Sequence, residues 1–180
     1  MLGNNSEINL SESILLKSKV LAFYEIIGGL VGIGLTLYII IKLTAFPTLL
    51  LFLLFIAFAL YIFSIICGVT LLKNLKSGYK LSRFNQFLQI VNFSMLGFGF
   101  HYISGLFMTI GMDLSEHFNI NVNWGTSSWN FDFNNNQGIN YFSINIIAII
   151  IAIFIDKQLK HLEKLDLDQK LSQLGDANPN

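Results

Sequence analysis

The chain has 180 residues, of which 53% are hydrophobic and 12% are charged, and its formal net charge is zero. Soluble domains carry about 25% charged residues, so this composition is typical of a chain that alternates between lipid and water. The neutral charge gives no reason to expect nucleic acid as a partner. The single cysteine, Cys67, excludes an internal disulfide and a metal site made of clustered thiolates.

Hydropathy predicts four apolar segments that cross a membrane as helices, at residues 20–41, 47–72, 84–112 and 139–155. A bilayer core about 30 Å thick needs roughly 20 apolar residues in a helix, and a helix satisfies its own backbone groups in lipid. We therefore expect an all-α integral membrane protein, an antiparallel four-transmembrane-helix bundle that forms a single domain over residues 1–180. The first segment is too long for a signal peptide and carries Glu25, so we expect it to be retained.

The distribution of basic residues predicts the orientation of these segments. Ten of them lie before the first segment, between the second and third, and after the fourth: Lys17, Lys19, Lys73, Lys76, Lys80, Arg83, Lys157, Lys160, Lys164 and Lys170. Lys42 is the only one in the other two connections. We therefore expect a multi-pass protein of the inner membrane with both termini in the cytoplasm and the lipid bilayer as its partner.

The connection at residues 113–138 is expected outside the cytoplasm. Apolar and polar residues alternate on both sides of Gly125–Ser128, which predicts a short β-hairpin between the third and fourth helices. Its apolar face is expected to lie against the membrane or the helix ends, through Trp124, Trp129, Phe131 and Phe133. Leucines at helical spacing in residues 156–180 predict a cytoplasmic amphipathic helix.

Polar side chains inside the expected spans are the candidate functional residues, because polar groups in hydrocarbon are costly. Glu25 is the only acid deep inside an expected span, and it has two interpretations. It is either a structural carboxylate, with Lys80 or Arg83 as a possible mate, or a proton or cation site. The other candidates lie on the third segment and are Asn85, Gln89, Asn92 and His101.

Glycines in the same segments are expected to allow close helix packing. They are Gly28, Gly29, Gly32, Gly97 and Gly105. Asp113, Glu116 and His117 lie within five residues but match no metal-binding motif, so we interpret them as part of a solvated loop.

Three functions fit this pattern. The first is a non-enzymatic membrane component that acts through contacts with itself or with another membrane protein. The second is a small oligomeric channel or transporter that uses Glu25 and the polar face of the third segment. The third is a lipid-modifying enzyme with Glu25, His101 or His117 as acid or base. The sequence contains no phosphate-binding loop, no Gly-x-Ser-x-Gly and no His-Glu-x-x-His, so we expect no catalytic, cofactor-binding or metal-binding residues.

Overall fold

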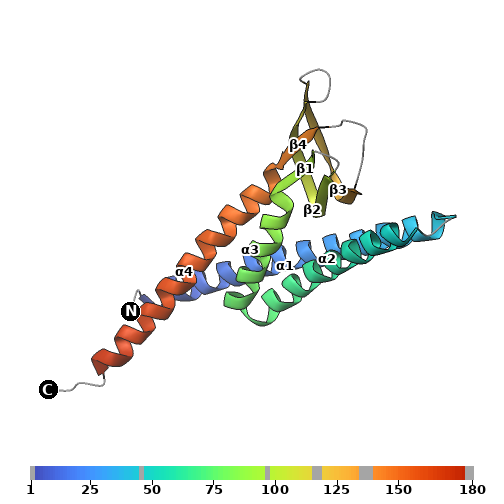
Figure 1. The fold of residues 1–180 in the computed structure, drawn as a ribbon. Coiled ribbons are helices and arrows are strands. Elements are labelled where there is room, and N and C mark those ends of the chain that lie inside the picture. Colours follow the sequence, from blue (N-terminus) through green and yellow to red (C-terminus); the bar gives the residue numbers. More distant parts are fainter. Residues whose placement is uncertain (1–2, 45–46, 96–97, 115–118, 134–139, 177–180) are drawn as a thin grey trace.

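The structure is a computed structural model that describes residues 3–44, 47–95, 98–114, 119–133 and 140–176. Its elements in chain order are α1 (Gly3–Lys42), α2 (Thr48–Lys73), α3 (Leu75–Ile90), β1 (Val91–Met95), β2 (Phe98–Asp113), β3 (Asn119–Phe133), β4 (Tyr141–Asn145) and α4 (Ile146–Asp176). In Figure 1, α1 and α2 run side by side as a long hairpin, and the sheet lies against it. α4 leads away from the sheet to the end of the molecule where both termini lie.

Two helices are long and apolar enough to cross a membrane, judged by length and composition. They are Ser13–Lys42, within α1, and Thr48–Lys73, which is α2. The two helices approach closely through glycine: a Cβ on Gly68 would lie 2.5 Å from the Ala22 carbonyl oxygen. The first two predicted spans therefore correspond to helices of spanning length.

The expected all-α bundle is wrong, because a four-stranded antiparallel sheet follows the third helix. The predicted span 84–112 begins as α3 but leaves the helix after Ile90 and continues as β1 and β2. Four glycines interrupt residues 97–111, and each costs about 1 kcal/mol in a helix relative to alanine. Hydropathy measures apolar character alone, so it does not distinguish a buried strand from a spanning helix.

The predicted span 139–155 is wrong for a similar reason. Tyr141–Asn145 form strand β4, and α4 begins at Ile146. The Asn145 side-chain oxygen accepts a hydrogen bond from the Ala148 backbone N–H at 3.5 Å, as an N-cap does. Only about ten apolar residues then remain before Asp156, roughly half of what a span needs. The amphipathic helix expected within residues 156–180 is the continuation of this same helix, which ends at Asp176.

The expected hairpin around Gly125–Ser128 is also wrong, although its strand character is right. Residues 119–133 form one continuous strand, β3, which pairs along its length with β2. The sheet order is β1-β4-β2-β3, and β1 also pairs with the first residues of β2. The alternation that predicted two short strands belongs to one long strand. Its partner, β2, lies in the segment that was predicted to be the third span.

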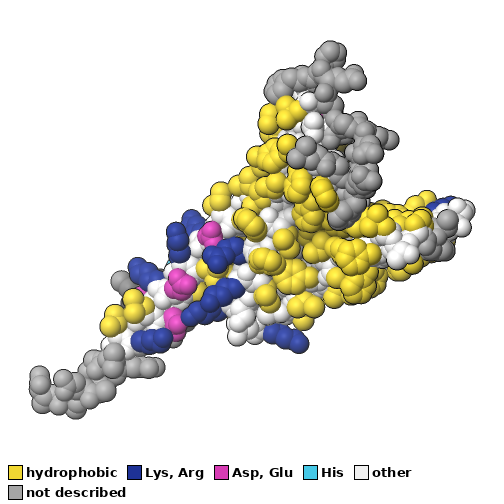
Figure 2. All heavy atoms as spheres, viewed as in Figure 1, with side chains coloured by type: hydrophobic (Ala, Val, Ile, Leu, Met, Phe, Trp, Pro, Cys, Tyr) yellow, Lys and Arg dark blue, Asp and Glu magenta, His cyan; other side chains and the backbone are white. Residues whose placement is uncertain are grey.

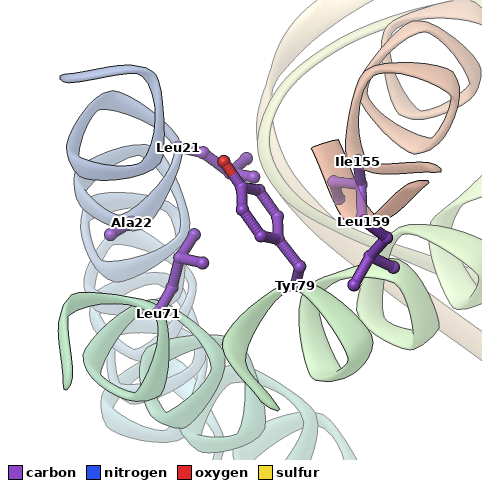
Figure 3. Close-up of a cluster of buried hydrophobic side chains, with 6 residues drawn as sticks. All are labelled: Leu21, Ala22, Leu71, Tyr79, Ile155 and Leu159. Carbon is purple, nitrogen blue, oxygen red and sulfur yellow. The ribbon is translucent and has the colours of Figure 1, made fainter. Parts of the chain in front are cut away.

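Two buried clusters hold the helices and the sheet together. In the first, side chains from all four helices meet around Tyr79, as Figure 3 shows; its members are Leu21, Ala22, Leu71, Tyr79, Ile155 and Leu159. The second joins α2 to the sheet, through Leu53, Ala57, Tyr61, Tyr102 and Phe131. The first cluster thus packs the four helices together near the chain termini. The second packs the sheet against the middle of the α1–α2 hairpin.

The surface of the molecule is divided by chemistry. In Figure 2 the charged side chains gather over the far part of α4 and the adjoining helices, while hydrophobic side chains cover the sheet and the hairpin. No Lys or Arg lies between Arg83 and Lys157 in the sequence. Many large apolar side chains on α1, α2 and the strands are exposed, such as Phe55 at 71% and Trp124 at 84%.

Candidate functional site

Glu25 lies at the centre of a buried polar network between α1, α2, α3 and β2. Its carboxylate is fully buried and accepts three hydrogen bonds from α3. Ser82 Oγ donates to Oε2 at 2.6 Å, while Asn85 Nδ2 and Gln86 Nε2 donate to Oε1 at 3.2 and 3.3 Å. The donors lie at positions i, i+3 and i+4 of α3, which places them on one helix face.

The network continues from Asn85 into α2 and β2. Asn85 Nδ2 also donates to Ser64 Oγ at 3.2 Å, and Ser64 Oγ donates to the Glu25 carbonyl at 3.0 Å. Ser104 Oγ of β2 donates to Ser64 Oγ at 2.9 Å. Tyr102 OH donates to Asn85 Oδ1 at 3.2 Å. The side chains therefore connect the hairpin, α3 and the sheet through hydrogen bonds as well as through apolar contact.

Two further amide side chains, Gln89 near the end of α3 and Asn92 in β1, bind the β2 backbone. Gln89 Oε1 accepts a hydrogen bond from the Ser104 N–H at 2.8 Å, and Asn92 Oδ1 accepts one from the Tyr102 N–H at 3.3 Å. Three buried amide atoms have no hydrogen-bond partner within the described part of the chain: Gln86 Oε1, Gln89 Nε2 and Asn92 Nδ2. Buried polar atoms usually find a protein or water partner, so this row of amides has the capacity to bind more than the protein supplies.

Four of the predicted polar residues are brought together. Glu25, Asn85, Gln89 and Asn92 are all fully or almost fully buried, on one side of α3 or facing it. Among the described residues, no ion pair joins Glu25 to Lys80 or Arg83, the basic partners that the sequence suggested. Arg83 instead pairs with Asp156 at 3.2 Å, and both side chains are about half exposed. The carboxylate is therefore held by neutral donors.

The fifth predicted residue, His101, lies apart from this network. Its Nε2 is 2.6 Å from Ser128 Oγ of β3, and its ring meets the Phe107 ring edge-on. Burial lowers the pKa of His101 below its usual value, so the ring is neutral at neutral pH. No group of three His, Cys, Asp or Glu side chains that could hold a metal occurs in the described ranges. Glu116 and His117 lie outside the described residues.

The predicted packing glycines have two different roles. Gly29 and Gly32 lie against α2, where added Cβ atoms would meet Ile65 and the ring of Tyr61. Gly28 instead lies against strand β2, where its Cβ would be 2.5 Å from the Gly105 backbone nitrogen. Close approach was expected between helices, but Gly28 provides it between a helix and a strand. Gly97 lies outside the described residues.

Gly28 contacts β2 at a bulge in the sheet. The register between β2 and β3 shifts between Ile103 and Leu106, and Gly105 there has φ +102°, which favours glycine. Ser127 Oγ accepts a hydrogen bond from the Gly105 N–H at 3.0 Å and donates to the Gly28 carbonyl at 2.8 Å. Tyr24 OH donates to the Leu106 carbonyl at 2.9 Å. The bulge thus positions β2 on α1.

The aromatic residues expected on one outer face are divided between two environments. Trp124 is 84% exposed, whereas Phe131 is only 7% exposed and packs in the cluster with Tyr61 and Tyr102. The Trp129 ring lies 5.6 Å from that of Phe131. The side chain of Phe133 lies outside the described part of the structure.

Several members of the network were not among the predicted residues. Ser82 and Gln86 had a detectable signal, because residues 82, 85, 86 and 89 share a helical face. The remaining members are Ser64, Tyr102 and Ser104. They join the network because β2 packs against the α1–α2 hairpin, which the sequence did not predict. A search of protein-family models, of curated proteins and of solved structures finds no match to this chain.

Proposed function

We propose that this chain is a non-enzymatic membrane protein that acts through contact with a second copy of itself, by pairing along the open edge of β3. The observation that carries the proposal is that β3, whose outer edge pairs with no other strand among the described residues, lies beside an exposed apolar face.

The open edge of β3 has few of the features that usually prevent strand pairing, and Asp132 near its end is its only charged residue. β3 is the last strand in the sheet order, has 15 residues, and contains no Lys, Arg or Pro. At about 3.3 Å per residue it is about 50 Å long. Soluble proteins protect such edges by shortening them or by placing charges or proline on them. An edge with so few of these features is suited to pairing with another strand.

The face next to this edge is apolar and exposed. Three cross-strand pairs follow one another at alternate positions of β2 and β3, so their side chains share one face: Met108–Trp124, Ile110–Val122 and Met112–Ile120. Their exposed fractions range from 37% for Met112 to 84% for Trp124. A contiguous apolar face of this kind marks a surface that contacts protein or membrane.

The position of the sheet strengthens the case for a partner strand. We propose that the α1–α2 hairpin crosses the inner membrane twice. Its two ends would then lie in the cytoplasm, because basic residues precede α1's apolar stretch and follow α2, whereas only Lys42 lies at the tip. Gly28 and Tyr61, which contact the sheet, lie near the middle of the two candidate spans. Unpaired backbone groups at that depth cost several kcal/mol each, and a partner strand would satisfy them.

Single cysteines along β3 test the pairing. Cys67 is buried and is first replaced by serine. Cysteine is then placed singly at positions 120, 122, 124 and 126, and disulfide dimers are measured in membranes and in mild detergent. Antiparallel pairing of two identical strands brings only positions near the two-fold axis together, so one or two adjacent positions should cross-link strongly.

The matched control uses the same face of the inner strand. Cysteine at Met108 or Ile110 is similarly exposed but lies one strand away from the edge, so it should cross-link poorly. Light scattering of the purified protein should give a dimer. A monomer with uniformly low cross-linking at all four β3 positions would contradict the proposal.

A second candidate function, passage of a proton or small cation, is favoured by the unpartnered amide atoms of Gln86, Gln89 and Asn92 beside the Glu25 network. This function requires the carboxylate charge, so Glu25→Gln should abolish flux in proteoliposomes. Flux that is absent from the wild-type protein, or unchanged by the substitution, would remove this candidate. The geometry does not favour a lipid-modifying enzyme, because His101 Nε2 lies 2.6 Å from Ser128 Oγ and outside the Glu25 network.

A further inference from the structure

Two cavities between α1 and α4 share one lining residue, Lys17. The first has a volume of about 470 Å³ and is otherwise lined by uncharged side chains, mainly apolar. Those from α1 include Leu16, Val20 and Leu21, and those from α4 are Ile150, Ile151 and Phe154. Val20 and Ile150 are 63% and 60% exposed, so this groove is open to the surroundings.

The second cavity, of about 390 Å³, is basic. Lys17 reaches it from α1, while α4 contributes Lys157, Lys160, His161 and Lys164. The α4 residues recur at spacings of three and four, which places them on one helix face. No acidic side chain that the structure describes lines this cavity, and the described ion pairs include none of its four lysines.

Two acidic residues of α4 near this cavity already have basic partners. Asp156 pairs with Arg83 at 3.2 Å, and Asp166 pairs with Lys76 at 3.1 Å. Glu163 belongs to the same stretch of α4 but does not line the cavity. His161 Nε2 is a buried atom that has no hydrogen-bond partner among the described residues. Four lysines that converge with no described acidic side chain among them repel one another, so the cavity favours an anion.

Together, the two cavities form a site with an apolar part and a cationic part. We propose that the groove between α1 and α4 binds one anionic phospholipid. Its phosphate lies among Lys17, Lys157, Lys160 and Lys164, and one acyl chain lies along the apolar cavity toward Tyr24. From Lys17 to Tyr24, α1 rises about 10 Å. A free phosphate ion would leave this adjoining apolar groove unused.

Apolar residues give way to lysines at the same place on both helices. α4 is apolar from Ile146 to Ile155 and carries Lys157, Lys160 and Lys164 soon after, while α1 carries Lys17 and Lys19 just before the apolar stretch that begins at Val20. Because Lys17 and Lys157 line the same cavity, the two boundaries coincide in space. Basic pockets between helices at such a boundary are suited to lipid headgroups. This site includes no residue of β3, so it does not depend on strand pairing.

Lipid titration of the full chain tests the proposal. The purified protein is placed in phosphatidylcholine nanodiscs with increasing phosphatidylglycerol, and the thermal midpoint and the lipid retained in native mass spectra are measured. A ligand that binds only the folded state raises the midpoint as its concentration rises. Phosphatidylglycerol should therefore raise it to saturation, with one lipid retained, and free glycerol phosphate should not.

Variants locate the binding. Replacing Lys157 and Lys160 together by glutamine should weaken phosphatidylglycerol binding about thirty-fold. The matched control replaces Lys73 and Lys80, which lose the same charge but do not line the cavity. Filling the groove with Val20→Trp and Ile150→Trp should also weaken binding.

The residues replaced are exposed, so each variant should keep the wild-type midpoint in pure phosphatidylcholine. Equal weakening by both lysine pairs would attribute binding to general surface charge and overturn the proposal. An equal midpoint shift with free glycerol phosphate would assign the cavity to a soluble anion instead. Wild-type affinity in the tryptophan variant would exclude the acyl chain from the groove.

Discussion

Gly28 of α1 lies directly against Gly105 of β2, so closely that a Cβ on Gly28 would be 2.5 Å from the Gly105 nitrogen. The obstructing atoms are backbone, which cannot rotate away as a side chain can. Gly28→Ala should therefore separate the helix from the sheet and lower the unfolding free energy by about 1–3 kcal/mol, as overpacking does. Thermal unfolding in detergent measures the change.

Gly34 provides the control for this prediction. It lies in the same helix, and an added Cβ there would meet nothing within 4 Å. Gly34→Ala should raise the unfolding free energy by up to about 1 kcal/mol, because alanine favours helix more than glycine does. If both substitutions were neutral or stabilising, α1 would not contact the sheet at Gly28.

The Glu25 network predicts a ranking of substitutions. Glu25→Gln keeps an oxygen for Asn85 and Gln86, and the Ser82 hydroxyl can turn to accept from the new amide. Its cost should be about 1 kcal/mol or less. Glu25→Ala removes the acceptor of three buried hydrogen bonds and creates a cavity, so it should cost about 3 kcal/mol or more. Chemical unfolding of both variants gives the ranking.

A different ranking of the two Glu25 variants would also be informative. If glutamine were as destabilising as alanine, the negative charge itself would hold the network, and a cation would have to balance it. Asn85→Ala separates the contributions further, because Asn85 also bonds to Ser64 and Tyr102. Its loss should reduce stability more than Gln86→Ala, whose described hydrogen bond goes to Glu25 alone.

Four of the five polar residues selected from the sequence lie together in the structure, whereas the fold expected around them is wrong. Asn85, Gln89 and Asn92 share a side of the chain whether residue 92 ends a helix or begins a strand, so the local spacing was sufficient. The remainder of the third segment depends on partners distant in sequence: Met108 pairs with Trp124, and Ile110 pairs with both Val122 and Ile144. Local apolar character carries no information about such pairing.

The same limit explains the incorrect hairpin. Strand β3 alternates in the way that the sequence indicated, but an alternating strand does not specify its partner. The glycine and serines at residues 125–128, interpreted as a turn, instead lie beside the β2 bulge. There Ser127 bonds to both Gly105 and Gly28. Turn-forming residues in a strand can indicate a bulge or a close backbone approach as well as a chain reversal.

Tyr79 joins the four helices and should be sensitive to truncation. It is fully buried, and its hydroxyl lies 2.7 Å from Ser18 Oγ, which itself donates to the Ile14 carbonyl. Tyr79→Phe should cost about 0.5–1.5 kcal/mol for the lost hydrogen bond, and Tyr79→Ala about 3–5 kcal/mol for the lost packing. Tyr38, 60% exposed on α1, is the control. Loss of its hydroxyl should leave the unfolding free energy unchanged in a thermal melt.

His101 should make stability depend on pH. Burial lowers its pKa in the folded state, whereas the unfolded chain has the ordinary value of about 6.5. As the pH falls below about 6.5, the unfolded state therefore binds a proton that the folded state resists, and the unfolding free energy decreases. The stability that neutral His101 contributes is fully present above about pH 6.5. It is lost as the pH falls from there to the lowered pKa of the folded state.

The His101→Gln variant isolates this effect, because its amide can keep the contact with Ser128 but cannot titrate in this range. Unfolding free energies of the wild type and the variant are compared from pH 7.5 to pH 5. The difference between them should be constant above about pH 6.5 and should shift in favour of the variant below it. A difference that stays constant over the whole range would show that the imidazole titrates alike in the folded and unfolded states, which would contradict its burial between β2 and β3.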